Sequence, residues 1–167
     1  MRFEKVSLKA FADDMYKYHY GQGATMIYSA WDGIKLPTRS TEYSAGYDIR
    51  IPIDVTIPAG ERRVIPTGIR AVFDENEKGS WHLQLYVRSS VGIKQGIVLT
   101  NGTGIIDPDY MDAKNEGDFL LALMNTSDLP VKFKAGDRVC QGVFTLHGLT
   151  TDDKAKGRRT GGVGSTG

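Results

Sequence analysis

Short runs of alternating apolar and polar residues, broken by glycine and proline, constrain the fold of this chain most. In residues 49–57, isoleucine or valine occupies every second position. This period of two is typical of a β-strand with one buried face, so we expect a single strand over 49–57. Further apolar stretches with strand character lie at 64–73, 81–87, 119–124 and 139–146. Pro66 and Gly68 interrupt the first of these, and the whole pattern predicts an all-β barrel or jelly roll.

The N-terminal stretch has a different period. Apolar side chains recur at three- and four-residue intervals at Leu8, Phe11, Met15 and Tyr18. This spacing predicts a short helix, which the glycines at 21 and 23 would end. We therefore expect an N-terminal helical extension (1–24), one β domain (25–156) and a glycine-rich C-terminal tail (157–167).

Composition and charge exclude several classes of function. The chain has 167 residues and a net charge of +1, so no global basic field attracts nucleic acid. No apolar run is long enough to cross a membrane, and no calcium-loop or zinc-ligand spacing occurs. The single cysteine, Cys140, rules out an internal disulfide and indicates a reducing cytoplasm. Its strand position predicts a buried side chain and not a nucleophile.

Arg88, Ser89 and Ser90 follow an apolar strand and are candidate anion ligands. One guanidinium and two hydroxyl groups at a strand end suit phosphate oxygens. A solvated strand end has the same composition, so the three residues alone leave both interpretations open.

Residues 101–110, Asn-Gly-Thr-Gly-Ile-Ile-Asp-Pro-Asp-Tyr, concentrate the most unusual chemistry. Gly102 and Gly104 predict a tight hairpin whose backbone can meet a flat ligand edge-on. Pro108 favours an extended conformation at Asp107, which would hold its carboxylate rigidly, as a general base requires. Tyr110 offers a ring face nearby. An ordinary β-turn is the alternative interpretation.

The last ten residues, 158–167, contain four glycines, two arginines and one sizeable apolar side chain, Val163. Glycine adds no packing, but it brings backbone N–H groups close to an anion. The segment therefore suits a basic flap over a negatively charged ligand. Taken alone, its composition favours a frayed chain end.

Five motifs occur in one order along the chain: Ala45-Gly-Tyr-Asp48, Arg88-Ser-Ser-Val-Gly92, residues 101–110, Gly136-Asp-Arg-Val-Cys-Gln141 and the tail. In this order and spacing they resemble the motifs of the trimeric dUTP pyrophosphatase (dUTPase) family, over roughly residues 26–167. The resemblance implies a jelly-roll subunit and a homotrimer with three shared active sites. It also implies hydrolysis of dUTP to dUMP and pyrophosphate, which lowers dUTP and supplies dUMP for thymidylate synthesis. Mg²⁺ would be held by the triphosphate and water, with no direct protein ligand.

The same resemblance implies roles for residues that contact the nucleoside. Asp107 would orient and deprotonate the attacking water and contact the sugar 3′-hydroxyl. Tyr110 would pack on the deoxyribose and leave no room for a 2′-hydroxyl. Asn101 and the backbone around Gly104 and Ile106 would read the uracil edge and exclude the thymine methyl group.

The resemblance also implies which residues hold the phosphates. Candidate phosphate ligands are Arg88, Ser89, Ser90 and Gln141, with Asp48 in a supporting role. The tail would form a lid, ordered only with nucleotide, through Arg158 or Arg159, Val163, Gly164, Ser165 and Thr166. It would reach a site on a neighbouring subunit.

This chain departs from the family pattern at three places. Val163 stands where the family usually has an aromatic ring over the uracil, which implies weaker binding or a looser lid. The pair Arg158 and Arg159 leaves the register of the last motif open by one residue. Residues 111–118 form a longer stretch than the family's shortest versions, expected as a surface loop near the site.

Two other functions remain compatible with these residues. A dCTP deaminase has the same fold and also handles a pyrimidine triphosphate, although the glycine-rich tail and residues 101–110 fit the pyrophosphatase better. A catalytically reduced trimer that binds nucleotide as a signal, or that recruits a protein partner, is the second alternative, favoured by Val163 alone. Release of pyrophosphate or ammonia distinguishes the three.

Overall fold

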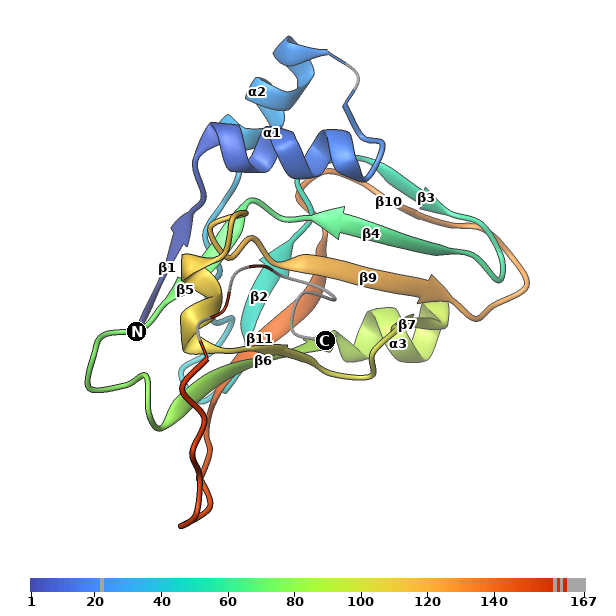
Figure 1. Cartoon of the computed structure of the whole chain (residues 1–167). Helices are drawn as coiled ribbons and strands as arrows, with labels where there is room; N and C mark the ends of the chain where they lie inside the picture. Colours follow the sequence, from blue (N-terminus) through green and yellow to red (C-terminus); the bar gives the residue numbers. More distant parts are fainter. Residues whose placement is uncertain (22, 158, 160, 162–167) are drawn as a thin grey trace.

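The computed structural model describes residues 1–21, 23–157, 159 and 161. Within these residues the chain is built mainly from short antiparallel strands, which confirms the predicted all-β class. α1 (Leu8–Lys17) and α2 (Ala24–Asp32) lie together at one end of the β structure, at the top of Figure 1. Residues 147–157 extend away from the opposite end.

The predicted N-terminal helix is confirmed as α1. Ser7 caps it by accepting a hydrogen bond from the Ala10 N–H at 3.1 Å. Its apolar face buries Phe11 and Met15 completely in the core of the β structure. Complete burial of such side chains stabilises the folded state by about 1.5–3 kcal/mol each. The helix is therefore part of the common core.

Two N-terminal elements were missed from the sequence. β1 (Arg2–Lys5) pairs with β5 (Ile69–Val72), so the first residues form an edge of the β structure. α2 buries only Ile27 fully, which gives it no clear apolar period. Lys5 binds the end of α2 by donating to the carbonyl oxygens of Trp31 and Asp32, at 3.0 and 2.9 Å.

The prediction of one strand over 49–57 was wrong. The structure has two strands, β2 (Tyr47–Arg50) and β3 (Val55–Ile57). β2 pairs with β11 (Arg138–Leu146), whereas β3 pairs with β10 (Val131–Phe133) in another sheet. Pro52, which has no N–H to donate to a ladder, lies in the crossing between the two sheets. The alternating pattern persists because Ile51 and Ile53 are buried in that crossing.

The other predicted strands are present. Pro66 and Gly68 divide the next stretch into β4 (Arg62–Pro66) and β5, as the sequence indicated. β6 (Trp81–Val87) and β11 form the centre of a four-stranded sheet of order β2-β11-β6-β8, with β8 at Gly104–Ile106. β9 (Leu120–Asn125) lies between β4 and β7 (Ile97–Leu99) in a three-stranded sheet.

Two short helices connect these strands near the predicted motifs. The strand end expected at Arg88 continues as α3 (Ser89–Gln95), so β6 stops at Val87 and the motif begins a helix. Gly96 ends α3 in the left-handed conformation, with φ +68°. A 3₁₀ helix, η1 (Pro108–Asp112), follows β8. Both helices place predicted site residues at the ends of β strands.

Candidate functional site

The turn at 100–103 brings a bare stretch of backbone to a sheet edge. It is not the predicted hairpin, because the two strands that it joins do not pair with each other. β7 pairs with β9 in one sheet, and β8 pairs with β6 in another. Gly102 takes φ +72°, and its N–H donates to the Leu99 carbonyl at 3.0 Å. A Cβ on Gly104 would lie 3.1 Å from Leu85 Cβ, so a larger residue there would crowd the pairing of β8 with β6. Within the described residues, β8 is the last strand of its sheet, so one of its backbone edges is available to a ligand.

Asp107 leaves β8 in the extended conformation that Pro108 predicted, with φ −74° and ψ 153°. Its carbonyl accepts the Tyr110 N–H at 3.0 Å, which fixes the first turn of η1. The Asp107 side chain remains 43% exposed. The carboxylate is thus presented to solvent from a backbone held in place on both sides.

Tyr110 is buried at the start of the loop that follows. Its hydroxyl donates to the Asp118 carbonyl at 2.9 Å and accepts from Asn115 Nδ2 at 3.0 Å. Burial raises the pKa of Tyr110 to about 12, so the hydroxyl stays protonated at neutral pH. The Tyr110 side chain is therefore uncharged and held in one position by its hydrogen bonds.

Arg159 covers these residues in the same chain. Its guanidinium forms ion pairs with Asp107 through Nη2 and with Asp109 through Nε, the latter at 3.0 Å. It also lies 5.7 Å from the centre of the Tyr110 ring. A pocket of about 130 Å³, here called the β8 pocket, is lined by Leu85, Asn101, Gly104, Ile105, Ile106, Tyr110, Leu120 and Arg159.

A second group of polar residues surrounds Asp48 in β2. One carboxylate oxygen pairs with Arg88 Nε at 2.9 Å, and the other pairs with Arg138 Nη1 at 3.0 Å. Ser40 donates its hydroxyl to the same carboxylate at 2.8 Å. We call Ser40, Asp48, Arg88 and Arg138 the Asp48 cluster. Asp48 is buried, whereas both guanidinium groups are partly exposed. Two positive charges are therefore accessible to an anionic ligand.

The remaining candidate phosphate ligands lie beside this cluster in the chain. Ser89 and Ser90 are exposed in the first turn of α3, directly after Arg88. Gln141 lies opposite Asp48 in the pairing of β11 with β2. The residues predicted to bind phosphate therefore gather around β2, β11 and the start of α3.

The two groups are not joined within one chain. Among residues 1–21, 23–157, 159 and 161, no hydrogen bond or ion pair connects a member of the Asp48 cluster with Asn101, Asp107, Tyr110 or Arg159.

The chain matches the dUTPase family model over residues 32–167. The chain belongs to the dUTPase family. A deoxyuridine 5′-triphosphate nucleotidohydrolase of Lactococcus lactis subsp. lactis (strain IL1403) is 44% identical over 138 residues, which cover 81% of this chain and 89% of the relative. The protein of the same name from Haemophilus ducreyi (strain 35000HP / ATCC 700724) is 37% identical and covers 79% of this chain and 86% of the relative.

Solved dUTPase structures have the same fold. The crystal structure of dUTPase from Streptococcus mutans superposes with a TM-score of 0.67 at 32% identity, covering 90% of this chain and 98% of that one. A dUTPase from phage phi11 of S. aureus superposes with a TM-score of 0.60 at 22% identity, over 74% of this chain and 90% of that one, a likeness of fold. The predicted jelly-roll fold of the dUTPase type is confirmed.

Several dUTPase motif residues lie outside the described structure. They are Arg158, Val163, Gly164, Ser165 and Thr166. Arg159 is described, and it forms an ion pair with Asp107 of its own chain. Within the described residues, no three histidine, cysteine or acidic side chains gather as a metal site, and no helix is long and apolar enough to span a membrane.

Sequence reasoning missed two members of the Asp48 cluster. Arg138 stands inside the fourth motif, and the pairing of β11 with β2 brings it to Asp48. Ser40 lies eight residues before Asp48 in an irregular segment, where no periodicity marks it. Cys140 is fully buried, and burial raises the pKa of its thiol to about 12, in agreement with a structural role.

A larger cavity than the β8 pocket lies elsewhere in the described part of the chain. It measures about 900 Å³ and is lined mainly by α2 and residues 50–54. None of the predicted site residues lines it. Gly136, the first residue of the fourth motif, does line this cavity, but the predicted ligands of that motif do not.

Proposed function

We propose that this protein hydrolyses dUTP to dUMP and pyrophosphate, with Asp107 activating the water that attacks the α-phosphate. Family membership and the names of its relatives support the substrate and the reaction. The placement of Asp107 carries the choice of base, because its partly exposed carboxylate stands between Ile106 and Tyr110, which both line the β8 pocket. Such hydrolysis lowers dUTP and supplies dUMP for thymidylate synthesis.

The β8 pocket suits the nucleoside. The free edge of β8 beside Asn101 supplies backbone donors and acceptors for the uracil edge. The Tyr110 ring forms one side of the space for a deoxyribose. The two hydrogen bonds of its hydroxyl hold the ring in place, so that it cannot move to make room for a 2′-hydroxyl. Asp107, next to both, reaches the sugar 3′-hydroxyl and a water on the α-phosphate.

The Asp48 cluster, Ser89, Ser90 and Gln141 suit the triphosphate. Phosphoryl chemistry depends on positioning and neutralisation of charge, and arginines and hydroxyls supply both. Asp48 holds Arg88 and Arg138 in place without touching the substrate. Mg²⁺ carried by the triphosphate would neutralise part of the phosphate charge, beside the charge that these arginines supply.

Membership of the dUTPase family supports a homotrimer with shared sites. In this proposal the β8 pocket of one subunit and the Asp48 cluster of another hold one dUTP between them. Arg159 pairs with the carboxylate of Asp107. Binding of dUTP transfers a tail arginine to the phosphates, frees the base and closes the lid formed by 158–167, with Val163 in place of a stacking ring.

The test is pyrophosphate release from dUTP, dTTP, dCTP and UTP with Mg²⁺, with ammonia measured in the dCTP reaction. We expect turnover of dUTP alone. Asp107→Asn should lower kcat by ~10²–10⁴-fold, the usual contribution of a general base, while dUTP binding stays measurable by calorimetry. Asp109→Asn, which alters the other carboxylate bound to Arg159, is the matched control and should keep most of the activity. Full turnover by the Asp107 variant would disprove the assignment of the base.

A further inference from the structure

The segment 111–118, which has no part in the chemistry above, supplies both hydrogen bonds of the Tyr110 hydroxyl. The hydroxyl donates to the main-chain carbonyl of Asp118 and accepts from the side-chain amide of Asn115, at 2.9 and 3.0 Å. Both capacities of a phenol are thereby used. The far end of the Tyr110 ring is thus anchored in this segment.

The amide of Asn115 is itself fixed in one orientation. Its second amide hydrogen donates to Asp14 Oδ2 in α1 at 3.1 Å, and its Oδ1 accepts the Gly117 N–H at 3.3 Å. A flipped amide would turn its oxygen toward the Asp14 carboxylate and its NH₂ toward another N–H donor. Every polar atom of Asn115 therefore specifies asparagine at this position.

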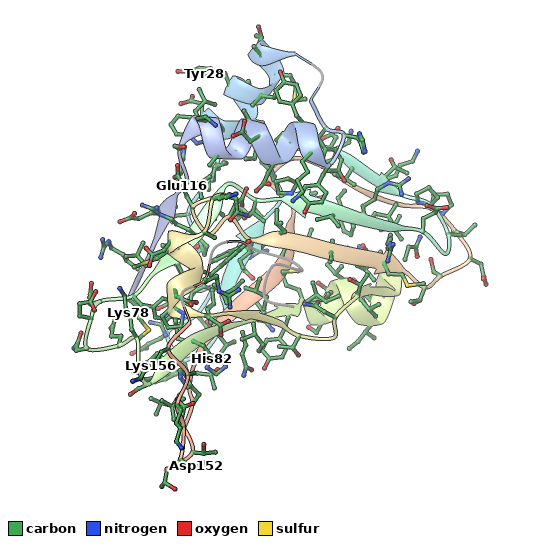
Figure 2. The ribbon with its side chains drawn as sticks, viewed as in Figure 1. Tyr28, Lys78, His82, Glu116, Asp152 and Lys156 are labelled. Carbon is green, nitrogen blue, oxygen red and sulfur yellow. The ribbon has the colours of Figure 1, made fainter. Side chains whose placement is uncertain are left out.

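Two further residues of the segment, Glu116 and Asp118, accept hydrogen bonds from distant parts of the chain. The Glu116 carboxylate accepts the Ser7 N–H at 2.8 Å and the Ser7 hydroxyl at 2.6 Å. Figure 2 shows Glu116 next to α1, on the loop that leads back toward β9. Asp118 Oδ1 accepts the N–H groups of Thr67 and Gly68 at 3.1 and 2.7 Å.

Gly117 completes the arrangement. It takes φ +81°, and a Cβ there would lie 2.9 Å from Met111 Cα and 3.0 Å from the Tyr110 carbonyl oxygen. The loop therefore packs directly on the backbone of Tyr110, so its shape and the position of the tyrosine depend on each other.

We propose that Asn115 is a positioning residue for Tyr110, and that α1 and the segment 111–118 together set the discrimination between deoxyribose and ribose. The proposal rests on the proposed function, in which the Tyr110 ring packs on the sugar. The Tyr110 ring can exclude one extra hydroxyl group only if it does not move away from the sugar. The Asn115 amide limits this movement, because it bonds both to the Tyr110 hydroxyl and to Asp14 in α1. Without that amide the ring moves more freely and UTP is accommodated.

The experiment compares kcat/KM for dUTP with kcat/KM for UTP in the full-length protein. The wild type is measured first, and its failure to hydrolyse dUTP would refute the proposed function itself. Asn115→Ala should lower the dUTP/UTP ratio by about tenfold, as expected when one buried hydrogen bond is lost. The ratio is the decisive readout, because a less stable fold reduces the activity on both substrates in equal proportion.

Asn76→Ala removes the same side chain from an exposed loop and should leave the ratio unchanged. Tyr110→Phe, which keeps the ring but removes the anchored hydroxyl, should lower the ratio by a similar factor. Adding Asn115→Ala to Tyr110→Phe should then have no further effect on the ratio, because the amide acts through that hydroxyl.

A folded Asn115→Ala protein with the wild-type ratio would overturn the proposal, as would independent, additive effects of the two substitutions. If Asn115→Ala does not fold, Tyr110→Phe decides alone: a reduced ratio supports the anchor, and an unchanged ratio refutes it.

Discussion

A Cβ atom on Gly46 would lie 2.5 Å from Oε1 and 3.2 Å from Cβ of Gln141. Gly46 and Gln141 come from the first and fourth motifs, which the pairing of β2 with β11 brings side by side. The backbone of Gly46 is not in the left-handed region, so its need for glycine is steric. The missing side chain leaves the space in which the Gln141 amide rests.

We predict that Gly46→Ala displaces the Gln141 side chain and raises KM for dUTP by about tenfold, the effect of one lost hydrogen bond to a charged group. The melting temperature should change little, because the clash involves a half-buried side chain that can rotate away. Gly79→Ala is the control, since no atom lies within 4 Å of the position that its new methyl group would take. An unchanged KM in Gly46→Ala would show that Gln141 does not contact the substrate.

Local signals were read correctly from the sequence, and pairings between distant segments were not. Pro108 acts on the residue before it, so the extended conformation of Asp107 could be predicted. The period of α1 was legible for the same reason. The break between β2 and β3 could not be read, because it depends on which strands lie alongside each one.

The role of residues 111–118 was hidden for a similar reason. Asn115 bonds to Asp14, 101 residues earlier, and Glu116 bonds to Ser7, 109 residues earlier. In the sequence this segment is polar and aperiodic, as any surface loop would be. Only the fold shows that it bonds to the Tyr110 hydroxyl and packs on the Tyr110 backbone.

Shared active sites lead to a prediction about mixed oligomers. Arg88→Ala damages the Asp48 cluster, and Asp107→Asn damages the residue beside the β8 pocket, so each variant alone should be nearly inactive. When the two are unfolded together and refolded at equal amounts, roughly a quarter of the sites of a closed symmetric trimer should combine two intact halves. Pyrophosphate release from dUTP should recover to that level.

Active sites built within a single chain would give a different result. If each site is built within one chain, every site in the mixture carries a damaged group and no activity returns. Mixed oligomers must be demonstrated by mass spectrometry first, so that lack of exchange is not mistaken for lack of sharing. Each variant refolded alone is the control for recovery through refolding.

The buried Asp118 carboxyl group should make stability depend on pH. Burial, followed by the nearby Asp14 charge, raises the pKa of Asp118 well above its usual range, and its Oδ2 has no hydrogen-bond partner among the described residues. Burial likewise raises the pKa of Asp14. Above the ordinary carboxyl pKa of about 3.9, the folded state therefore holds protons that the unfolded state has released.

The sign follows from this difference in bound protons. A group whose pKa is raised by folding contributes most below its unfolded pKa, and that contribution is lost as the pH rises toward the folded pKa. Asp118→Asn imitates the protonated acid and can still accept from Thr67 and Gly68, but it does not titrate. The stability of the variant relative to wild type should therefore increase from pH 5 to pH 8.

Urea unfolding at fixed protein concentration measures this difference, because an oligomer's stability depends on concentration. Asp128→Asn, on an exposed loop, is the matched control, and its stability relative to wild type should be the same at both pH values. Parallel pH profiles for wild type and Asp118→Asn would mean that Asp118 is ionised in the folded protein. The three donors on its Oδ1, including the Thr67 hydroxyl, would then outweigh the cost of burial.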